Sequence, residues 1–137
     1  MDALLSLQLD PDYQPTETEP YMNPQQLIYY REKLLNMLAH FETKLKDTRR
    51  ELAEKENRPA DLIDYSDLNA FREMKINACY EYREMADKVR SALRRIEDGT
   101  YGYCQETGEE IGLRRLETLP HTPLSVDAQQ LMERRFH

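Results

Sequence analysis

The sequence predicts a mainly α-helical protein built around a long antiparallel helical hairpin. Residues 27–57 and 62–98 contain neither glycine nor proline. In each run apolar residues recur at alternating spacings of three and four, which is typical of a coiled coil. Pro59 separates the two runs and interrupts helical hydrogen bonding, so the chain is expected to turn back there. A small region of tight turns and a short C-terminal helix are expected to follow.

Residues 1–22 are expected to form an extended N-terminal arm, because three of the seven prolines fall within them and prevent a long helix. A helix-start signal follows at 23–26: an asparagine as N-cap, a proline at the first helical position and a glutamine three residues after the cap. The hairpin is therefore assigned to 23–98, with its tip near 58–67. Its apolar seam is expected at Leu27, Tyr30 or Arg31, Leu34, Leu38, Phe41 and Leu45 in the first helix, and at Leu68, Phe71, Met74, Ala78, Tyr82, Met85, Val89, Leu93 and Ile96 in the second.

Residues 99–125 are expected to form a small knuckle. Gly99 suits the left-handed position after the last helical turn. Residues 100–124 hold the other three of the four glycines and two prolines, as in a series of tight turns. Ser125 can cap a terminal helix over 126–137. The apolar residues expected to hold the knuckle together are Tyr101, Tyr103, Ile111, Leu113, Leu116 and Leu124.

Charge and hydropathy exclude several classes of function. The chain has 19 Lys and Arg against 26 Asp and Glu, a formal net charge of −7, whereas proteins that bind nucleic acid directly are usually basic. No stretch approaches the roughly 18–20 apolar residues that span a bilayer. We therefore expect a cytoplasmic, monomeric protein that binds neither nucleic acid nor membrane, with both cysteines reduced.

The knuckle carries a resemblance to a known family. The string YGYCQETGEEIGLRRLE at 101–117, followed by LSVDA at 124–128, resembles the DksA/TraR family of bacterial transcription factors. That family has a zinc finger with four cysteine ligands, whose positions fall here on Cys104, Thr107, Ser125 and Ala128. Because a structural zinc site needs four sulfur or nitrogen ligands, we expect a degenerate zinc finger without zinc and no other cofactor.

The hairpin tip contains Asp61, Asp64 and Ser66. By themselves, acidic residues at a turn are ordinarily N-caps. The resemblance implies instead that the hairpin enters the secondary channel of RNA polymerase and brings Asp61 and Asp64 near the catalytic magnesium ions. Ser66 stands where the family pattern has alanine, and its hydroxyl can also cap the second helix.

The resemblance also implies contacts away from the tip. In the family, basic residues bind the alarmone ppGpp at the polymerase interface. The corresponding positions here retain only Lys88, with Arg83 on an adjacent helical face, so a weak ppGpp response or none is expected. The alternative for Arg83 is a solvated surface charge. Four arginines are candidates for docking on the polymerase rim, with plain solvation as the alternative: Arg114, Arg115, Arg134 and Arg135.

The resemblance therefore implies a regulator of transcription initiation, acting at ribosomal RNA-type promoters in the stringent response. RNA polymerase is the expected partner. Two alternatives remain: a Gre-like transcript-cleavage or elongation factor, and a plain coiled-coil adaptor. An enzyme that uses Cys104 as nucleophile and His121 as base is not expected, because no third orienting group is identifiable and a lone histidine in a turn is more often a surface residue.

Overall fold

The computed structural model describes residues 8–135. Residues 1–7 of the predicted arm and 136–137 of the predicted terminal helix lie outside this description. The chain forms two compact units, one made of residues 37–87 and the other of the segments on either side, up to Asn36 and from Lys88. Helices α2 (Pro24–Glu56) and α3 (Tyr65–Asp98) contribute to both units. Within the described residues, no helix is long and apolar enough to cross a membrane.

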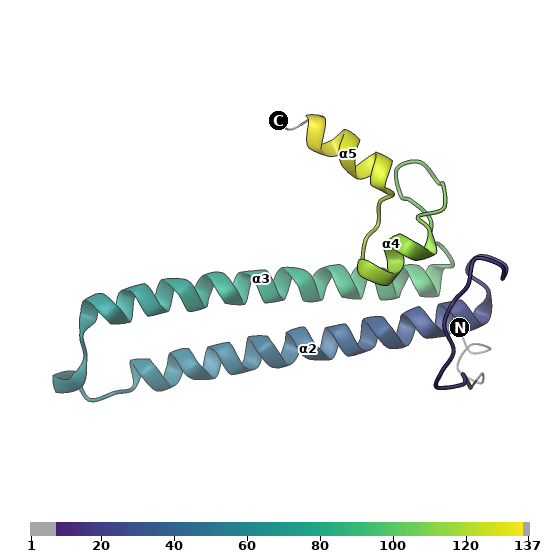
Figure 1. Ribbon diagram of the computed structural model, residues 1–137. Coiled ribbons are helices and arrows are strands. Elements are labelled where there is room, and N and C mark those ends of the chain that lie inside the picture. Colours follow the sequence, from purple (N-terminus) through teal and green to yellow (C-terminus); the bar gives the residue numbers. More distant parts are fainter. Residues whose placement is uncertain (1–7, 136–137) are drawn as a thin grey trace. The chain divides into compact units, whose positions relative to one another are not determined.

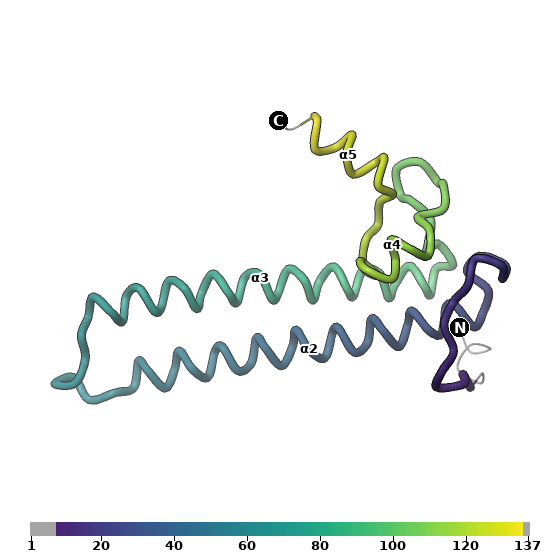
Figure 2. The backbone as a smooth tube through the Cα atoms, viewed as in Figure 1, coloured from purple at the N-terminus to yellow at the C-terminus, as the bar shows by residue number. Residues whose placement is uncertain are grey.

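The unit of residues 37–87 is a two-helix hairpin, as the sequence predicts. Within it α2 and α3 run antiparallel and side by side (Figure 1). The backbone between them turns through a single 3₁₀ turn, η1 (Ala60–Leu62), which can be followed in Figure 2. In the interface between the helices, Phe41 and Tyr82 approach to 6.5 Å between ring centroids, and Thr48 and Leu68 are buried.

The predicted seam is wrong at one position of this unit. Met74 is 57 % exposed, whereas the Lys75 side chain is only 20 % exposed and its Nζ lies 5.3 Å from the centroid of the Phe71 ring. The Lys75 ammonium also forms an ion pair with Glu51. After Phe71 the seam therefore advances by four residues, because the long Lys75 stem covers the ring while its charged end reaches a carboxylate.

In the other unit, the start of α2 is capped as the sequence predicts. The Asn23 side chain accepts a hydrogen bond of 3.0 Å from the Gln26 backbone N–H. The buried Gln26 side chain in turn accepts one of 2.8 Å from the Met22 backbone N–H. The core of this unit is made of apolar and aromatic residues from α2, α3 and the segment beyond: Ile28, Tyr30, Leu34, Val89, Ala92, Ile96, Tyr101 and Leu116.

The knuckle contains one helix that the sequence analysis did not predict, α4 (Leu113–Thr118). The terminal helix α5 (Val126–Arg135) begins as predicted, with the Ser125 hydroxyl accepting a hydrogen bond from the Ala128 backbone N–H at 3.2 Å. Gly99 ends α3 with a φ of 80°. Of the apolar residues expected to hold the knuckle together, Tyr103 is 36 % exposed and Leu113 half-buried, while four are buried as expected: Tyr101, Ile111, Leu116 and Leu124.

Residues 8–22, the described part of the arm, contain no helix. Their turns are held by local hydrogen bonds, including those that the Tyr13 hydroxyl donates to the Glu19 carboxylate. Burial and this carboxylate raise the pKa of Tyr13 to about 12. Near its end the arm contacts the knuckle through Tyr21, whose ring packs edge-on against that of Tyr103 at 5.6 Å between centroids.

Candidate functional site

The acidic residues of the tip lie in a short ordered turn. Asp61 is an exposed residue of η1. Asp64 directly precedes α3, and its carboxylate accepts hydrogen bonds from the backbone N–H groups of Ser66 at 3.0 Å and Asp67 at 3.4 Å. Asp64 is thus the N-cap of α3. The hypothesis that the Ser66 hydroxyl caps this helix is wrong, because Ser66 lies inside the first turn as a backbone donor.

The tip has a small hollow of about 140 Å³. Basic groups stand on its wall beside the carboxylates, and one of them, Lys55, places its Nζ 4.2 Å from the centroid of the Phe71 ring. The tip therefore combines carboxylates, cations and apolar surface within a few residues. The lining residues are Lys55, Arg58, Leu62, Ile63, Asp64, Asp67 and Leu68.

A second site surrounds Cys104, which is 2 % exposed. Its backbone N–H donates to the Glu109 carbonyl at 2.7 Å, and its carbonyl accepts from the Gly108 N–H at 2.8 Å. Burial acts to raise the pKa of the Cys104 thiol, but hydrogen bonds from the hydroxyl and backbone groups of Thr107 and Ser125 outweigh it and lower the pKa to about 6. The sulfur is thus an acceptor held by its neighbours.

These residues do not fit a structural zinc ion. The fold brings Thr107 and Ser125 to Cys104. Ala128, at the start of α5, is buried and offers only a methyl group. One thiol, two hydroxyls and a methyl group supply one sulfur ligand, where a structural zinc site takes four sulfur or nitrogen atoms. In the part of the chain that the structure describes, no group of three or more His, Cys, Asp or Glu side chains can hold a metal ion.

The residues considered for ppGpp fall in different units, Arg83 in that of residues 37–87 and Lys88 in the other. Arg83 is exposed and lies with Arg49 beside a hollow lined by Ile76 and Cys79. Lys88 lies close enough to His121 to influence its titration: burial, then the charges of Lys88 and Arg95, lower the pKa of that imidazole.

His121 is not the surface residue that the sequence analysis expects. Its Nδ1 is buried and, among the described residues, has no hydrogen-bond partner. Its carbonyl accepts a hydrogen bond of 3.1 Å from the guanidinium of Arg95, which also bonds the Ser91 hydroxyl. Arg95 is only 7 % exposed, and burial lowers its pKa. Sequence reasoning missed this buried arginine because Arg94 and Arg95 form an ordinary basic pair in the sequence.

The four arginines considered for rim docking differ in their surroundings. The guanidinium of Arg115 donates to the Leu124 carbonyl at 2.9 Å and to the Thr122 hydroxyl at 3.4 Å, so it holds the chain that leads into α5. Arg114 is exposed on α4, and Arg134 and Arg135 are exposed in the last turn of α5. Three of the four guanidinium groups are therefore accessible.

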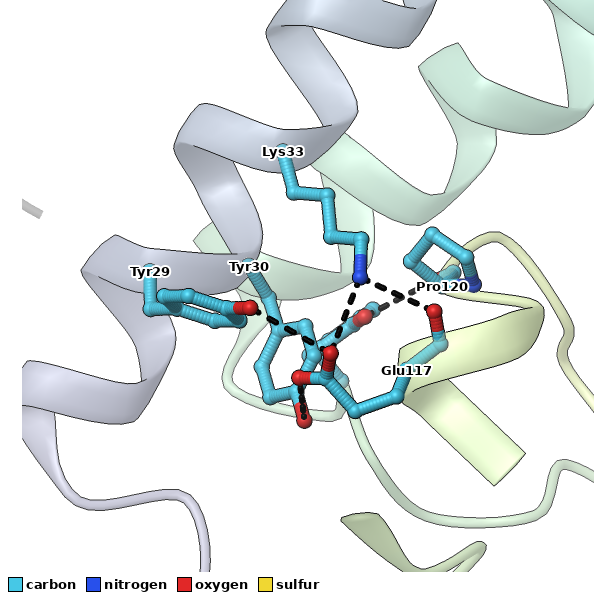
Figure 3. Close-up of polar contacts among 6 residues, drawn as sticks. Tyr29, Tyr30, Lys33, Glu117 and Pro120 are labelled. Carbon is cyan, nitrogen blue, oxygen red and sulfur yellow. Dashed lines mark hydrogen bonds and ion pairs between the residues drawn. The ribbon is translucent and has the colours of Figure 1, made fainter. Parts of the chain in front are cut away.

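A polar cluster joins α2 to α4 (Figure 3). The Glu117 carboxylate accepts hydrogen bonds from the hydroxyls of Tyr29 and Tyr30, each at 3.3 Å, and from the Lys33 ammonium at 3.1 Å. Tyr30 is fully buried, and burial followed by the charge of Glu117 raises its pKa. In the same region the Tyr101 hydroxyl donates to the Pro120 carbonyl at 2.7 Å. Such long-range pairing has no signal in the sequence.

Comparison with known proteins gives concordant matches. Residues 99–134 match a family model described as prokaryotic dksA/traR C4-type zinc finger. The RNA polymerase-binding transcription factor DksA of Caulobacter vibrioides is 42 % identical over 124 residues, covering 90 % of this chain and 87 % of that protein. The protein of the same name from Escherichia coli K12 is 32 % identical over 127 residues, covering 90 % and 82 %.

A solved structure is similar over nearly the whole chain. The transcription factor DksA2 from Pseudomonas aeruginosa matches with a TM-score of 0.79 at 31 % sequence identity, covering 98 % of this chain and 95 % of that one. The fold and the sequence thus point to the same group of proteins.

Proposed function

Because the chain belongs to the prokaryotic DksA/TraR family, we propose that it is a transcription regulator that binds RNA polymerase and modulates initiation. The observation that carries this proposal is its 42 % identity, over 90 % of its length, to a protein named as an RNA polymerase-binding transcription factor. Like that family it regulates without catalysing a reaction, and it acts on the polymerase in the cytoplasm rather than on DNA.

In this proposal the hairpin enters the secondary channel and its tip acts near the active site. The two acidic residues have different tasks there. One carboxylate oxygen of Asp64 accepts hydrogen bonds from backbone N–H groups in the first turn of α3, which fixes the turn, whereas Asp61 is exposed. We infer that Asp61 meets cationic groups of the polymerase active centre, while Asp64 shapes the turn and presents its remaining oxygen.

The knuckle docks outside the channel without a metal ion. Support comes from the donor set at Cys104, which is filled by hydroxyls where a zinc finger has thiolates. Arg114, Arg134 and Arg135 are the accessible cations for the polymerase rim. No resident cofactor is proposed. A ppGpp contact at the polymerase interface is weak in this proposal, because only Lys88 and Arg83 are at hand for it. Each charge-assisted hydrogen bond that is lost removes roughly 1.5–3 kcal/mol of binding free energy.

The deciding experiment measures the half-life of open complexes on a ribosomal RNA promoter with the cognate polymerase, with and without the protein and with and without ppGpp. The wild type should shorten the half-life, and both Asp61→Asn and Asp64→Asn should weaken this effect. Glu73→Gln is the matched control, because Glu73 is an exposed acid on α3 within the same unit. An unchanged half-life with wild-type protein would contradict the proposal.

The same reactions distinguish the two alternatives. Stimulated cleavage of the transcript in a stalled complex, lost in Asp61→Asn, would indicate a Gre-like factor whose carboxylates assist a second magnesium ion. Polymerase binding that leaves both lifetime and cleavage unchanged, with or without the tip carboxylates, would indicate an adaptor.

A further inference from the structure

The hairpin tip exposes apolar side chains between its acidic residues. Leu62 is 71 % exposed and follows Asp61, and Tyr65 is 63 % exposed and follows Asp64. A turn that only reverses the chain is usually built from Gly, Pro, Asn, Asp and Ser. Single exposed apolar residues are common on protein surfaces, but here two large ones alternate with carboxylates in one turn.

This turn is ordered by its own hydrogen bonds. The Leu62 N–H donates to the Pro59 carbonyl at 2.9 Å and the Ile63 N–H to the Ala60 carbonyl at 3.4 Å. At the other end the Leu68 N–H donates to the Asp64 carbonyl at 2.9 Å. A partner that contacts Leu62 and Tyr65 therefore meets side chains on a fixed backbone, which reduces the entropy lost on binding.

Leu62 also forms part of the wall of the tip hollow, together with Ile63 and Leu68. The volume of this hollow, about 140 Å³, is close to that of an apolar cavity of roughly 150 Å³ that holds a benzene-sized group. The hollow thus has room for one side chain of a partner. The charged groups of Lys55, Arg58, Asp64 and Asp67 stand on its wall beside the three apolar residues, so its lining is mixed.

We propose that the exposed Leu62 and Tyr65 form an apolar docking surface for RNA polymerase, which meets an aliphatic or aromatic side chain of the enzyme next to the groups that Asp61 meets. This inference rests on the proposed function. The choice of polymerase follows from continuity: a surface that reaches the Asp61 carboxylate also reaches the next residue, Leu62. The apolar contacts supply affinity, while the carboxylates supply the effect on the open complex.

The experiment measures the affinity of labelled protein for cognate RNA polymerase holoenzyme, and open-complex half-life at saturating protein. Leu62→Ser and Tyr65→Ser should each weaken binding about tenfold, corresponding to about 1.4 kcal/mol. At saturation both variants should still shorten the half-life. Asp61→Asn should show the opposite pattern, with near-normal binding and a lost effect. Tyr80→Ser is the matched control, since Tyr80 is 65 % exposed on α3 in the same unit, and its binding should stay within twofold of wild type.

The outcomes separate this inference from the function on which it rests. If wild-type protein fails to bind polymerase, both fall. If it binds and shortens the half-life but Leu62→Ser and Tyr65→Ser bind as tightly as wild type, only the docking surface is overturned. Equal weakening of binding by Tyr80→Ser would also overturn the docking surface. So would tip substitutions that change only self-association in sedimentation measurements, a result that would assign the surface to a second copy of the chain. Unfolding curves matching wild type show that the variants fold.

Discussion

The Tyr21 hydroxyl donates a hydrogen bond of 2.6 Å to the Gly102 carbonyl and accepts one of 3.0 Å from the Gly112 backbone N–H. One side chain of the N-terminal arm therefore joins two glycines, one on each of the two segments that the isolated antiparallel bridge between Tyr103 and Glu110 pairs. This contact fastens the N-terminal arm to the knuckle. Burial raises the pKa of Tyr21, so its hydroxyl remains protonated and able to donate.

Tyr21→Phe should destabilise the protein by about 1–3 kcal/mol, because it removes both hydrogen bonds and leaves the two backbone groups without this partner. Denaturant unfolding measures the loss, and amide hydrogen exchange should show faster exchange at Gly112. Tyr80→Phe, at an exposed position, should change stability by less than about 0.5 kcal/mol. Equal stability of Tyr21→Phe and wild type would contradict this role of the arm.

Cys104→Ala should destabilise the knuckle by about 1–3 kcal/mol, because the hydroxyls of Thr107 and Ser125 lose their buried acceptor. Cys104→Ser keeps an acceptor and should recover part of the loss. Cys79→Ala, at a half-buried site of the other unit, should cost less.

A chelator and elemental analysis complete this test. Unfolding of the purified protein should be unchanged by EDTA, and zinc should be well below one equivalent per chain. A stoichiometric zinc ion, with stability lost in EDTA, would show that other ligands complete a metal site.

Glu117→Ala should cost about 1–3 kcal/mol, since it leaves the hydroxyl of the fully buried Tyr30 without its carboxylate. The ion pair with Lys33, which is partly exposed, should contribute little, within about 1 kcal/mol. In the background of Tyr30→Phe the same substitution should cost less, and this double-mutant cycle is read from denaturant unfolding. If the destabilisations caused by Glu117→Ala and Tyr30→Phe simply add, the contribution of Glu117 to stability does not come from its hydrogen bond with Tyr30.

Stability should fall as the pH is lowered below about 6.5, the usual pKa of histidine, in part because of His121. Its pKa is lowered in the folded state, so in this window the unfolded chain binds more protons and unfolding becomes easier. His121→Gln should therefore show a shallower decline in unfolding free energy between pH 7 and 5 than wild type. An identical slope would contradict the expectation, and the NMR titration of the imidazole reads its pKa directly.

The two tip aspartates should differ in their effect on stability. Asp64→Ala removes the N-cap of α3 and should cost about 0.5–2 kcal/mol, whereas Asp61→Ala, at an exposed position, should stay within about 0.5 kcal/mol of wild type. Thermal or denaturant unfolding gives both values. Equal losses would mean that Asp61 also holds the turn.

The long helices were predictable because a period of three and four, uninterrupted by glycine or proline, has few other interpretations. Helix α4 was not, because it is six residues long and begins after Gly112, which has a φ of 99° and supplies no side-chain cap. The sequence also did not reveal that Lys75 lies in the seam where Met74 was expected, because hydropathy patterns assign methionine to the interior and lysine to the surface.

The candidate site was predictable only in part. The positions of Asp61 and Asp64 follow from the family resemblance, but their different environments depend on where α3 begins. The exposed Leu62 and Tyr65 could not be distinguished from core residues by composition. The Glu117 cluster joins residues from distant parts of the sequence, and only the folded backbone brings them together.

The close approach of Met22 to Gly102 restricts which residues can occupy these two positions, although they lie far apart in the sequence. A Cβ atom on residue 102 would lie 2.7 Å from Met22 Cγ, and Gly102 has a φ of 91° while Met22 has a φ of 55°. Any side chain at 102 would thus displace the Met22 side chain and strain its own backbone. Evolution can vary residue 22 among side chains that fit against a bare α-carbon, but it can change residue 102 only at the cost of that contact and of a strained backbone. Residue 102 should therefore be the slower of the two to diverge.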